Sequence, residues 1–223
     1  MTHKIQTTLF SFRDLSYRDF QSKLMPTVDP NTVIGVRMPD LRKLAKKIGI
    51  EKTFLRSLPH NYYEENNLHA LMIMQISDYS DAISAVNSFL PYVDNWATCD
   101  LLTPKIFEKS KEKLLPEIKN WIESNHPYTV RFGIGMLMRH FLDGDFSVEY
   151  PNMIVAIESD EYYVNMMIGW YFATALAKQY NAILPYLEDH RLPKIPHNMA
   201  IRKAIESYRI TAQQKAYLVT LKR

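Results

Sequence analysis

The chain has 223 residues, of which 47% are hydrophobic and 23% charged, and its formal net charge is +3. This length and apolar content suffice for a buried core and predict a single domain over residues 1–223. The apolar runs are too short to cross a bilayer, so no membrane contact is expected. The N-terminus lacks a secretory pattern and the single cysteine, Cys99, cannot form an internal disulfide, which predicts a cytoplasmic protein. No metal or cofactor is expected.

Helical patterns follow one another along almost the whole chain, and no segment alternates apolar and polar residues for long enough to predict a strand. Helices are expected near residues 7–25, 39–48, 60–76, 79–90, 104–124, 127–142, 146–158, 161–180, 197–207 and 211–222. In the second of these, Pro39 suits the first turn and Gly49 the end. Thr103 is predicted to cap the helix that opens at Pro104, and Pro116 to break or kink it.

Two of the helical segments resemble each other at an offset of 34 residues. When HPYTVRFGIGMLMRHFL is aligned with DEYYVNMMIGWYFATAL, Ile134 and Gly135 fall on Ile168 and Gly169. The stretch PYVDNWATCDLL precedes the first of them by 36 residues. A two-helix unit that recurs at this spacing is typical of an α-α superhelix, or solenoid, whose concave face is lined by one helix of each pair. We therefore predict an all-α fold of this class.

Within VDNWATCDLL, Trp96 precedes Asp100 by four residues, so an indole and a carboxylate share one face of a helix. In most proteins such a pair is a core tryptophan beside a salt-bridged aspartate. The repeat alignment, however, groups Trp96 with Arg131 and Trp170 of the next two repeats. Because equivalent repeat positions converge on one surface, the sequence predicts that these residues lie on a common face.

Basic residues gather in two places. The first cluster is Arg37, Arg42, Lys43, Lys46 and Lys47. The second is the segment 191–223, which contains eight Lys or Arg residues, Arg202 and Lys203 among them, and a single acidic residue, Glu206. Such asymmetry suits contact with a polyanion, although each cluster taken alone also fits an ordinary solvated helix face.

Four segments carry a resemblance to a known family. VIGVRMPDLRKLAKKI, DNWATCDLL, TVRFGIGMLMRHFLD and EYYVNMMIGWYFATALAKQY resemble the signature segments of the AlkD-like DNA alkylation repair proteins, over roughly residues 20–210. The resemblance implies tandem HEAT-like repeats that wrap duplex DNA on a concave basic face. It also implies a glycosylase that removes cationic N3- or N7-alkylated purines without flipping the base into a pocket, in a monomeric protein associated with the nucleoid when bound.

The resemblance assigns roles to particular residues. Asp100 maps to the functional carboxylate, Trp96 and Trp170 to the two site tryptophans, and Arg131 to an arginine that holds a phosphate. The remaining residues that it places against the DNA backbone are Arg37, Arg42, Lys43, Lys46, Arg202 and Lys203. Ala173 stands where active relatives usually carry an arginine, and the segment before Val33 also departs from the family. Both departures keep two alternatives open: a DNA-structure-binding protein without activity, and a protein-interaction solenoid.

The assigned chemistry agrees with elementary considerations. Alkylation leaves positive charge on the purine, so the base departs as a neutral molecule without an acid to protonate it. The site must then stabilise positive charge on the deoxyribose, which a carboxylate does electrostatically and indole faces do by cation–π contact. The remaining candidates carry less. Glu64, Glu65 and His69 form only a weak metal-binding pattern, Cys99 fits a buried thiol, and Trp121 fits a packing residue.

Overall fold

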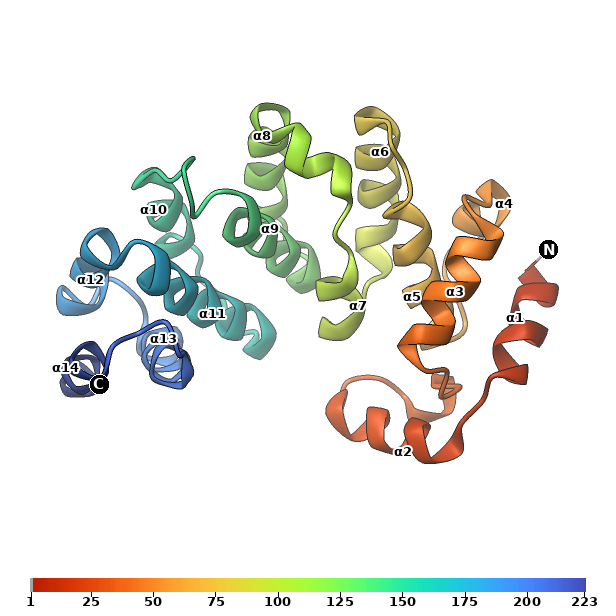
Figure 1. Ribbon diagram of the computed structural model, residues 1–223, viewed down its shortest axis with the longest axis horizontal. Helices are drawn as coiled ribbons and strands as arrows, with labels where there is room; N and C mark the ends of the chain where they lie inside the picture. The colour runs from red at the N-terminus through yellow and green to blue at the C-terminus, as the bar shows by residue number, and fades with distance from the viewer. Residues whose placement is uncertain (1) are drawn as a thin grey trace. The chain divides into compact units, whose positions relative to one another are not determined.

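All regular secondary structure in the computed structural model, which describes residues 2–223, is helical (Figure 1). The chain divides into two compact units, Met1–Ser110 and Lys111–Arg223. The first unit contains α1 (Thr2–Ser11), α2 (Leu15–Leu24), η1 (Pro30–Thr32), α3 (Met38–Ile48), α4 (Lys52–Arg56), α5 (Tyr63–Ile73), α6 (Tyr79–Phe89), η2 (Leu90–Tyr92), α7 (Trp96–Leu101) and η3 (Lys105–Lys109). The second contains α8 (Lys111–Ile122), α9 (Pro127–His140), α10 (Glu149–Val155), α11 (Tyr162–Lys178), α12 (Tyr180–Glu188), α13 (Lys194–Glu206) and α14 (Ala212–Thr220).

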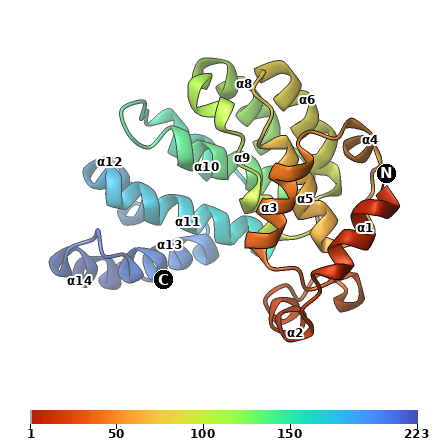
Figure 2. The same cartoon turned by 45° about the vertical axis from the view of Figure 1, so that its right-hand side comes forward.

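The helices pack as a helical repeat. In the second unit α8 packs on α9, α9 on α11 and α11 on α13, and both views of the ribbon show α11 beside α13 (Figures 1 and 2). The two aligned segments are α9 and α11, and their equivalent residues Ile134 and Ile168 are both buried. In the first unit α3 packs on α5 and α5 on α7. The predicted all-α repeat class is therefore confirmed.

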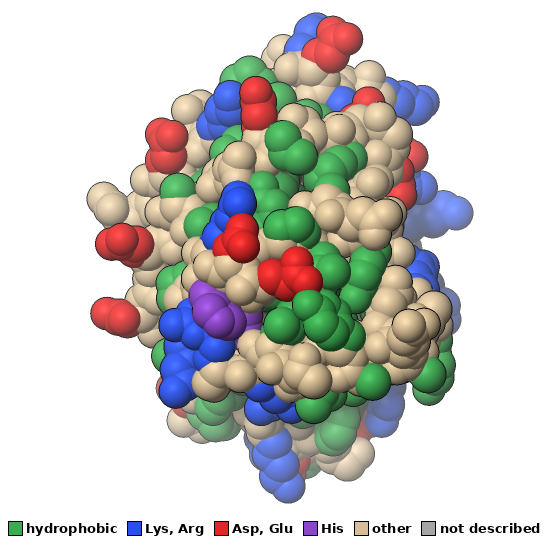
Figure 3. All heavy atoms as spheres, turned by 90° about the vertical axis from the view of Figure 1, so that its left-hand side faces the viewer, with side chains coloured by type: hydrophobic (Ala, Val, Ile, Leu, Met, Phe, Trp, Pro, Cys, Tyr) green, Lys and Arg blue, Asp and Glu red, His purple; other side chains and the backbone are tan. Residues whose placement is uncertain are grey.

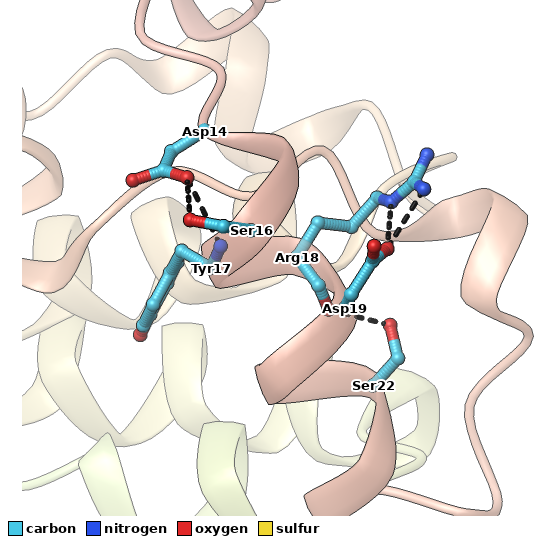
Figure 4. Close-up of polar contacts among 6 residues, drawn as sticks. All are labelled: Asp14, Ser16, Tyr17, Arg18, Asp19 and Ser22. Atoms are coloured by element: carbon cyan, nitrogen blue, oxygen red, sulfur yellow. Dashed lines mark hydrogen bonds and ion pairs between the residues drawn. The ribbon is translucent and has the colours of Figure 1, made fainter.

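The prediction of one helix over residues 7–25 was wrong, because Asp14 divides it into α1 and α2. The Asp14 carboxylate accepts hydrogen bonds from the Tyr17 backbone N–H, at 3.0 Å, and from the Ser16 hydroxyl, at 2.7 Å (Figure 4). Such capping starts a new helix. The Asp14 N–H donates in turn to the carbonyl of Gly35 at 3.0 Å, which turns the chain at this point.

The expected helix over 104–124 is also divided, into η3 and α8. Thr103 is not a cap, since its hydroxyl donates to the Leu101 carbonyl at 3.3 Å. Pro116 does not break α8. It lies on the exposed side of the helix, so the Glu112 carbonyl that loses an N–H partner faces water. The short helices α4 and α12 were not predicted.

A buried carboxylate holds the segment that leads into α3. Glu64 of α5 is fully buried and accepts hydrogen bonds from three consecutive backbone N–H groups: Ile34 at 2.8 Å, Gly35 at 2.7 Å and Val36 at 3.1 Å. Burial raises the pKa of Glu64, and the three N–H groups oppose that rise. Gly35 has a φ of +96°, a conformation that glycine adopts readily. The side chain therefore replaces the backbone partners that this irregular segment lacks.

Two histidines, the partly buried His60 and the buried His69, lie side by side and contact aromatic rings of α4 and α6. A ring nitrogen of His60 lies 2.8 Å from one of His69, and the rings stack on Phe54 and Phe89, with centroids 4.4 and 4.1 Å apart. Burial lowers the pKa of His60 to about 4 and that of His69 to about 3. Residues 2–223 contain no cluster of three or more metal-ligating side chains.

This pair makes the fold sensitive to acid. The ordinary pKa of histidine is 6.5, so below this pH both histidines of the unfolded chain bind protons. In the folded protein His60 stays neutral down to about pH 4, because its pKa is lowered to about 4. We expect the free energy of unfolding to fall with decreasing pH across this window, by up to about 1.4 kcal/mol per pH unit for each histidine. Urea unfolding of the protein and of His60→Phe between pH 7 and 5 measures the effect. An equal slope in both proteins would contradict the assignment to His60.

Among residues 2–223, no helix has the length and apolar character that a bilayer crossing requires.

Candidate functional site

The short helix α7 carries the two residues that the sequence singles out in the first unit. Its N-terminus is fixed by Asn95, whose side-chain oxygen accepts from the Thr98 N–H at 2.8 Å. The Thr98 hydroxyl is buried and donates to the Asn67 side-chain oxygen of α5 at 2.9 Å. These contacts anchor one side of α7 to the core and leave Trp96 and Asp100, four residues apart, partly exposed.

Trp96 is held against the N-terminal part of the first unit. Its indole N–H donates to the Leu24 carbonyl at the end of α2, at 3.1 Å. The ring packs against a small apolar cluster of Met25, Val28, Val33 and Tyr63. Asp100 lies one turn further along α7 and is likewise half-buried. The arrangement places an oriented aromatic ring and a carboxylate along one edge of a short helix.

Arg131 and Trp170 belong to the second unit and lie on the packed helices α9 and α11. Trp170 is 37% exposed. Arg131 is only 3% exposed, and its guanidinium donates to the Tyr163 carbonyl in the first turn of α11 at 2.8 Å. The structure therefore gives Arg131 a role in joining α9 to α11, and its predicted phosphate contact stays a prediction. So does the common face of these two residues with Trp96 and Asp100.

Position 173 faces the interior. Ala173 is buried on α11, where an arginine would have to displace packed neighbours to reach solvent. The same helix approaches α13 closely. A Cβ atom added at Gly169 would lie 2.6 Å from the Cβ of Met199. The close approach of α11 to α13 therefore depends on the absence of a side chain at Gly169.

The first basic cluster separates into paired and unpaired residues. Arg37 donates to Asp14 through Nε and Nη2, at 3.0 and 2.8 Å, and its guanidinium lies 4.8 Å from the Tyr17 ring centroid. The Tyr17 backbone N–H, the Ser16 hydroxyl and Arg37 together hold the pKa of Asp14 well below its usual range. Lys43 pairs loosely with Asp40, at 3.8 Å. Arg37 and Lys43 are thus partly neutralised.

Arg42 and Lys46 differ from these two, since both are exposed and form no ion pair with any of residues 2–223. In the second cluster, Arg202 is exposed, while Lys203 pairs with Glu206 at 3.1 Å. Acidic side chains lie among the Lys and Arg side chains on the face drawn in Figure 3. The basic residues on that face are therefore interspersed with acidic ones.

Two predictions about packing are confirmed. Cys99 is a buried thiol that forms no disulfide. Trp121 is buried and packs edge-on against Phe132, with ring centroids 4.8 Å apart. Two further basic residues, Lys105 and Lys109 of η3, were missed by the sequence reading, although their spacing of four in KIFEK offers a signal.

Comparison with known proteins identifies a family. The profile of a family described as DNA alkylation repair enzyme matches residues 5–208. No curated protein matches the chain. The matched range covers α2 to α13 completely and includes every residue named above as a site candidate.

Proposed function

The chain belongs to the DNA alkylation repair enzyme family, and from this premise we propose that it is a DNA glycosylase acting on cationic N3- or N7-alkylated purines. In this proposal residues 1–223 act as one domain of HEAT-like repeats. Duplex DNA lies on a concave face with the base left out of any pocket, and the protein acts as a monomer in the cytoplasm or on the nucleoid.

The observation that carries the proposal is the pairing of Trp96 with Asp100 on α7. As the glycosidic bond breaks, its electron pair passes to the cationic purine, which leaves neutral, and the deoxyribose becomes positive at C1′. A carboxylate beside that carbon stabilises the developing charge. Water then bonds to C1′ and releases a proton, for which Asp100 is the nearby acceptor in this scheme.

The aromatic residues have a supporting role. The flat face of Trp96, held by Leu24, attracts a cation by about 0.5–2 kcal/mol. Trp170, exposed on α11, offers a second such face in the proposal. Arg37, Arg42, Lys43, Lys46, Arg202 and Lys203 contact backbone phosphates in the proposal and fix the position of the duplex without reading its sequence.

The test is the release of 7-methylguanine from N-methylated duplex DNA, measured by chromatography. Asp100→Asn keeps the shape of the side chain and removes its charge. We expect the rate of release to fall by at least about 10-fold, which corresponds to a lost interaction of about 1.4 kcal/mol.

Asp94, an exposed acid in the segment before α7, accepts a hydrogen bond from the Asn95 side chain at 2.8 Å. Asp94→Asn makes the same chemical change and keeps an oxygen that can accept this bond, so it serves as the control and is expected to keep full activity. Circular dichroism melting shows that both variants are folded. Unchanged release by Asp100→Asn would remove Asp100 from the mechanism.

Two observations favour a second candidate function, in which the protein binds DNA of unusual structure without breaking a bond. Ala173 is buried at the position where active relatives usually carry an arginine, and Arg131 is buried against Tyr163. Both reduce the number of cations available to phosphates. This candidate predicts salt-sensitive duplex binding without base release. A protein-interaction solenoid predicts no salt-sensitive duplex binding and no base release.

A further inference from the structure

A basic hollow lies in the first unit, and neither Trp96 nor Asp100 lines it. It is an open depression with a volume of about 630 Å³, lined by residues of α3, the segment from the end of α5 to Ser77, and η3. Two cations from α3, Arg42 and Lys46, line it together with two from η3, Lys105 and Lys109. Each pair is four residues apart in the chain. We call this feature the cationic hollow.

The four cations of the cationic hollow have no acidic partner among the residues that line it. No acidic residue lines it, and none of its four cations forms an ion pair or a side-chain hydrogen bond with any of residues 2–223. Arg37 and Lys43, by contrast, point to Asp14 and Asp40 and do not line it. Like charges gathered in this way destabilise the folded state unless an anion joins them.

The floor of the hollow is a built surface. The Gln75 side-chain N–H group donates to the Ala45 carbonyl at 3.1 Å and to the Leu71 carbonyl at 3.3 Å, which ties α3 to the end of α5. Apolar side chains, including Met74 and Ile106, complete it. Its volume lies within the range of about 300–1,000 Å³ that ligand sites span, and is larger than a bare phosphate needs.

We infer that the cationic hollow binds phosphate groups, with Arg42 as the planar, bidentate donor and the three lysines as point charges. Two carriers share this chemistry: the backbone of a DNA duplex, and a free phosphorylated small molecule. With the duplex as carrier, the inference rests on the proposed function and adds Lys105 and Lys109 to the DNA contacts. With a free molecule, it is independent of that function.

Neighbouring lysines of α3 provide a matched test. Lys46→Gln removes a charge from the cationic hollow, and Lys47→Gln removes the same charge from the next residue, which is exposed and does not line it. Binding of an unmodified duplex is measured by fluorescence anisotropy over a range of salt concentrations. We expect Lys46→Gln to reduce the slope of log K against log salt by about 0.9, and Lys105→Gln with Lys109→Gln by about 1.8. The slope for Lys47→Gln is expected to stay at the wild-type value.

A second arm identifies the carrier. Binding of inorganic pyrophosphate without DNA is measured by calorimetry for the same variants. Weaker pyrophosphate binding by the hollow variants, with the duplex slope unchanged, supports a free phosphorylated molecule as the ligand. The inference is overturned if Lys46→Gln and the double variant match Lys47→Gln in both arms. Because neither arm measures base release, an inactive protein with a hollow-dependent slope would reject the glycosylase proposal and retain this one.

The variants are not expected to unfold, since each removes repulsion between like charges. Thermal melting in the absence of ligand checks this, and the hollow variants are expected to melt at or above the wild-type temperature.

Discussion

Replacing Glu64 by alanine is expected to lower the free energy of unfolding by about 4 kcal/mol, since buried N–H groups left without an acceptor cost about 1–3 kcal/mol each. The variant leaves the N–H groups of Ile34, Gly35 and Val36 without their acceptor in a part of the protein that water does not reach. Removing a buried carboxylate returns part of its desolvation cost, so the loss is smaller than the sum. It is still a large share of the ordinary stability of a domain, about 5–15 kcal/mol.

Urea unfolding followed by circular dichroism measures this loss. Glu51 supplies the control, because it also accepts two backbone N–H groups, of Thr53 and Phe54, but at the accessible N-terminus of α4. Glu51→Ala is expected to cost only about 1 kcal/mol, the usual value of a helix cap. Glu64→Gln retains one oxygen and is expected to fall between the two. Equal losses for Glu64→Ala and Glu51→Ala would show that the buried carboxylate contributes no more than a surface cap.

Gly135 and Gly169 occupy equivalent repeat positions, yet we expect alanine to act on them with opposite sign. At Gly169 the new Cβ atom would lie 2.6 Å from the Cβ of Met199 and 3.1 Å from the backbone nitrogen of Ala200, so α11 and α13 must separate. Such overpacking costs about 1–3 kcal/mol. At Gly135 the nearest atom is the terminal methyl of Met167 at 3.6 Å, an ordinary contact. There the better helix propensity of alanine stabilises the protein by about 0.5–1 kcal/mol.

Thermal melting of the two single variants is the measurement. The melting temperature is expected to fall for Gly169→Ala and to rise for Gly135→Ala. A rise for both would mean that α11 and α13 separate at no cost, and that the close approach at Gly169 does not contribute to stability.

The repeat fold could be predicted from the chain because its signal is periodic. Apolar residues spaced for helices, and the coincidence of Ile134 and Gly135 with Ile168 and Gly169, depend only on the order of residues. The ends of helices depend on local chemistry that is less distinctive. Asp14 caps α2 through its carboxylate and also donates its N–H to Gly35, which is distant in the chain. Thr103 has the right residue type for a cap, but its hydroxyl donates to Leu101.

The candidate site was predictable to the level of residue type. The spacing of Trp96 and Asp100 indicated a shared helix face, and α7 carries both. The burial of Arg131 could not be predicted, because arginine side chains are exposed in most proteins. The division of the basic residues into ion-paired and unpaired ones could not be predicted either. Arg37 pairs with Asp14 only in the turn that Glu64 holds in place. Charges adjacent in the chain therefore differ in the partners that the fold gives them.

The hydrogen bond from the Trp96 indole to Leu24 limits what this ring can recognise. The indole nitrogen, its single polar atom, already donates to the main chain, so a ligand can contact only the carbon atoms of the ring. Such a surface can stack on a planar group or attract a positive charge. It cannot form hydrogen bonds with the donors and acceptors by which adenine differs from guanine. Discrimination at this residue would follow from damage to a base and not from its identity.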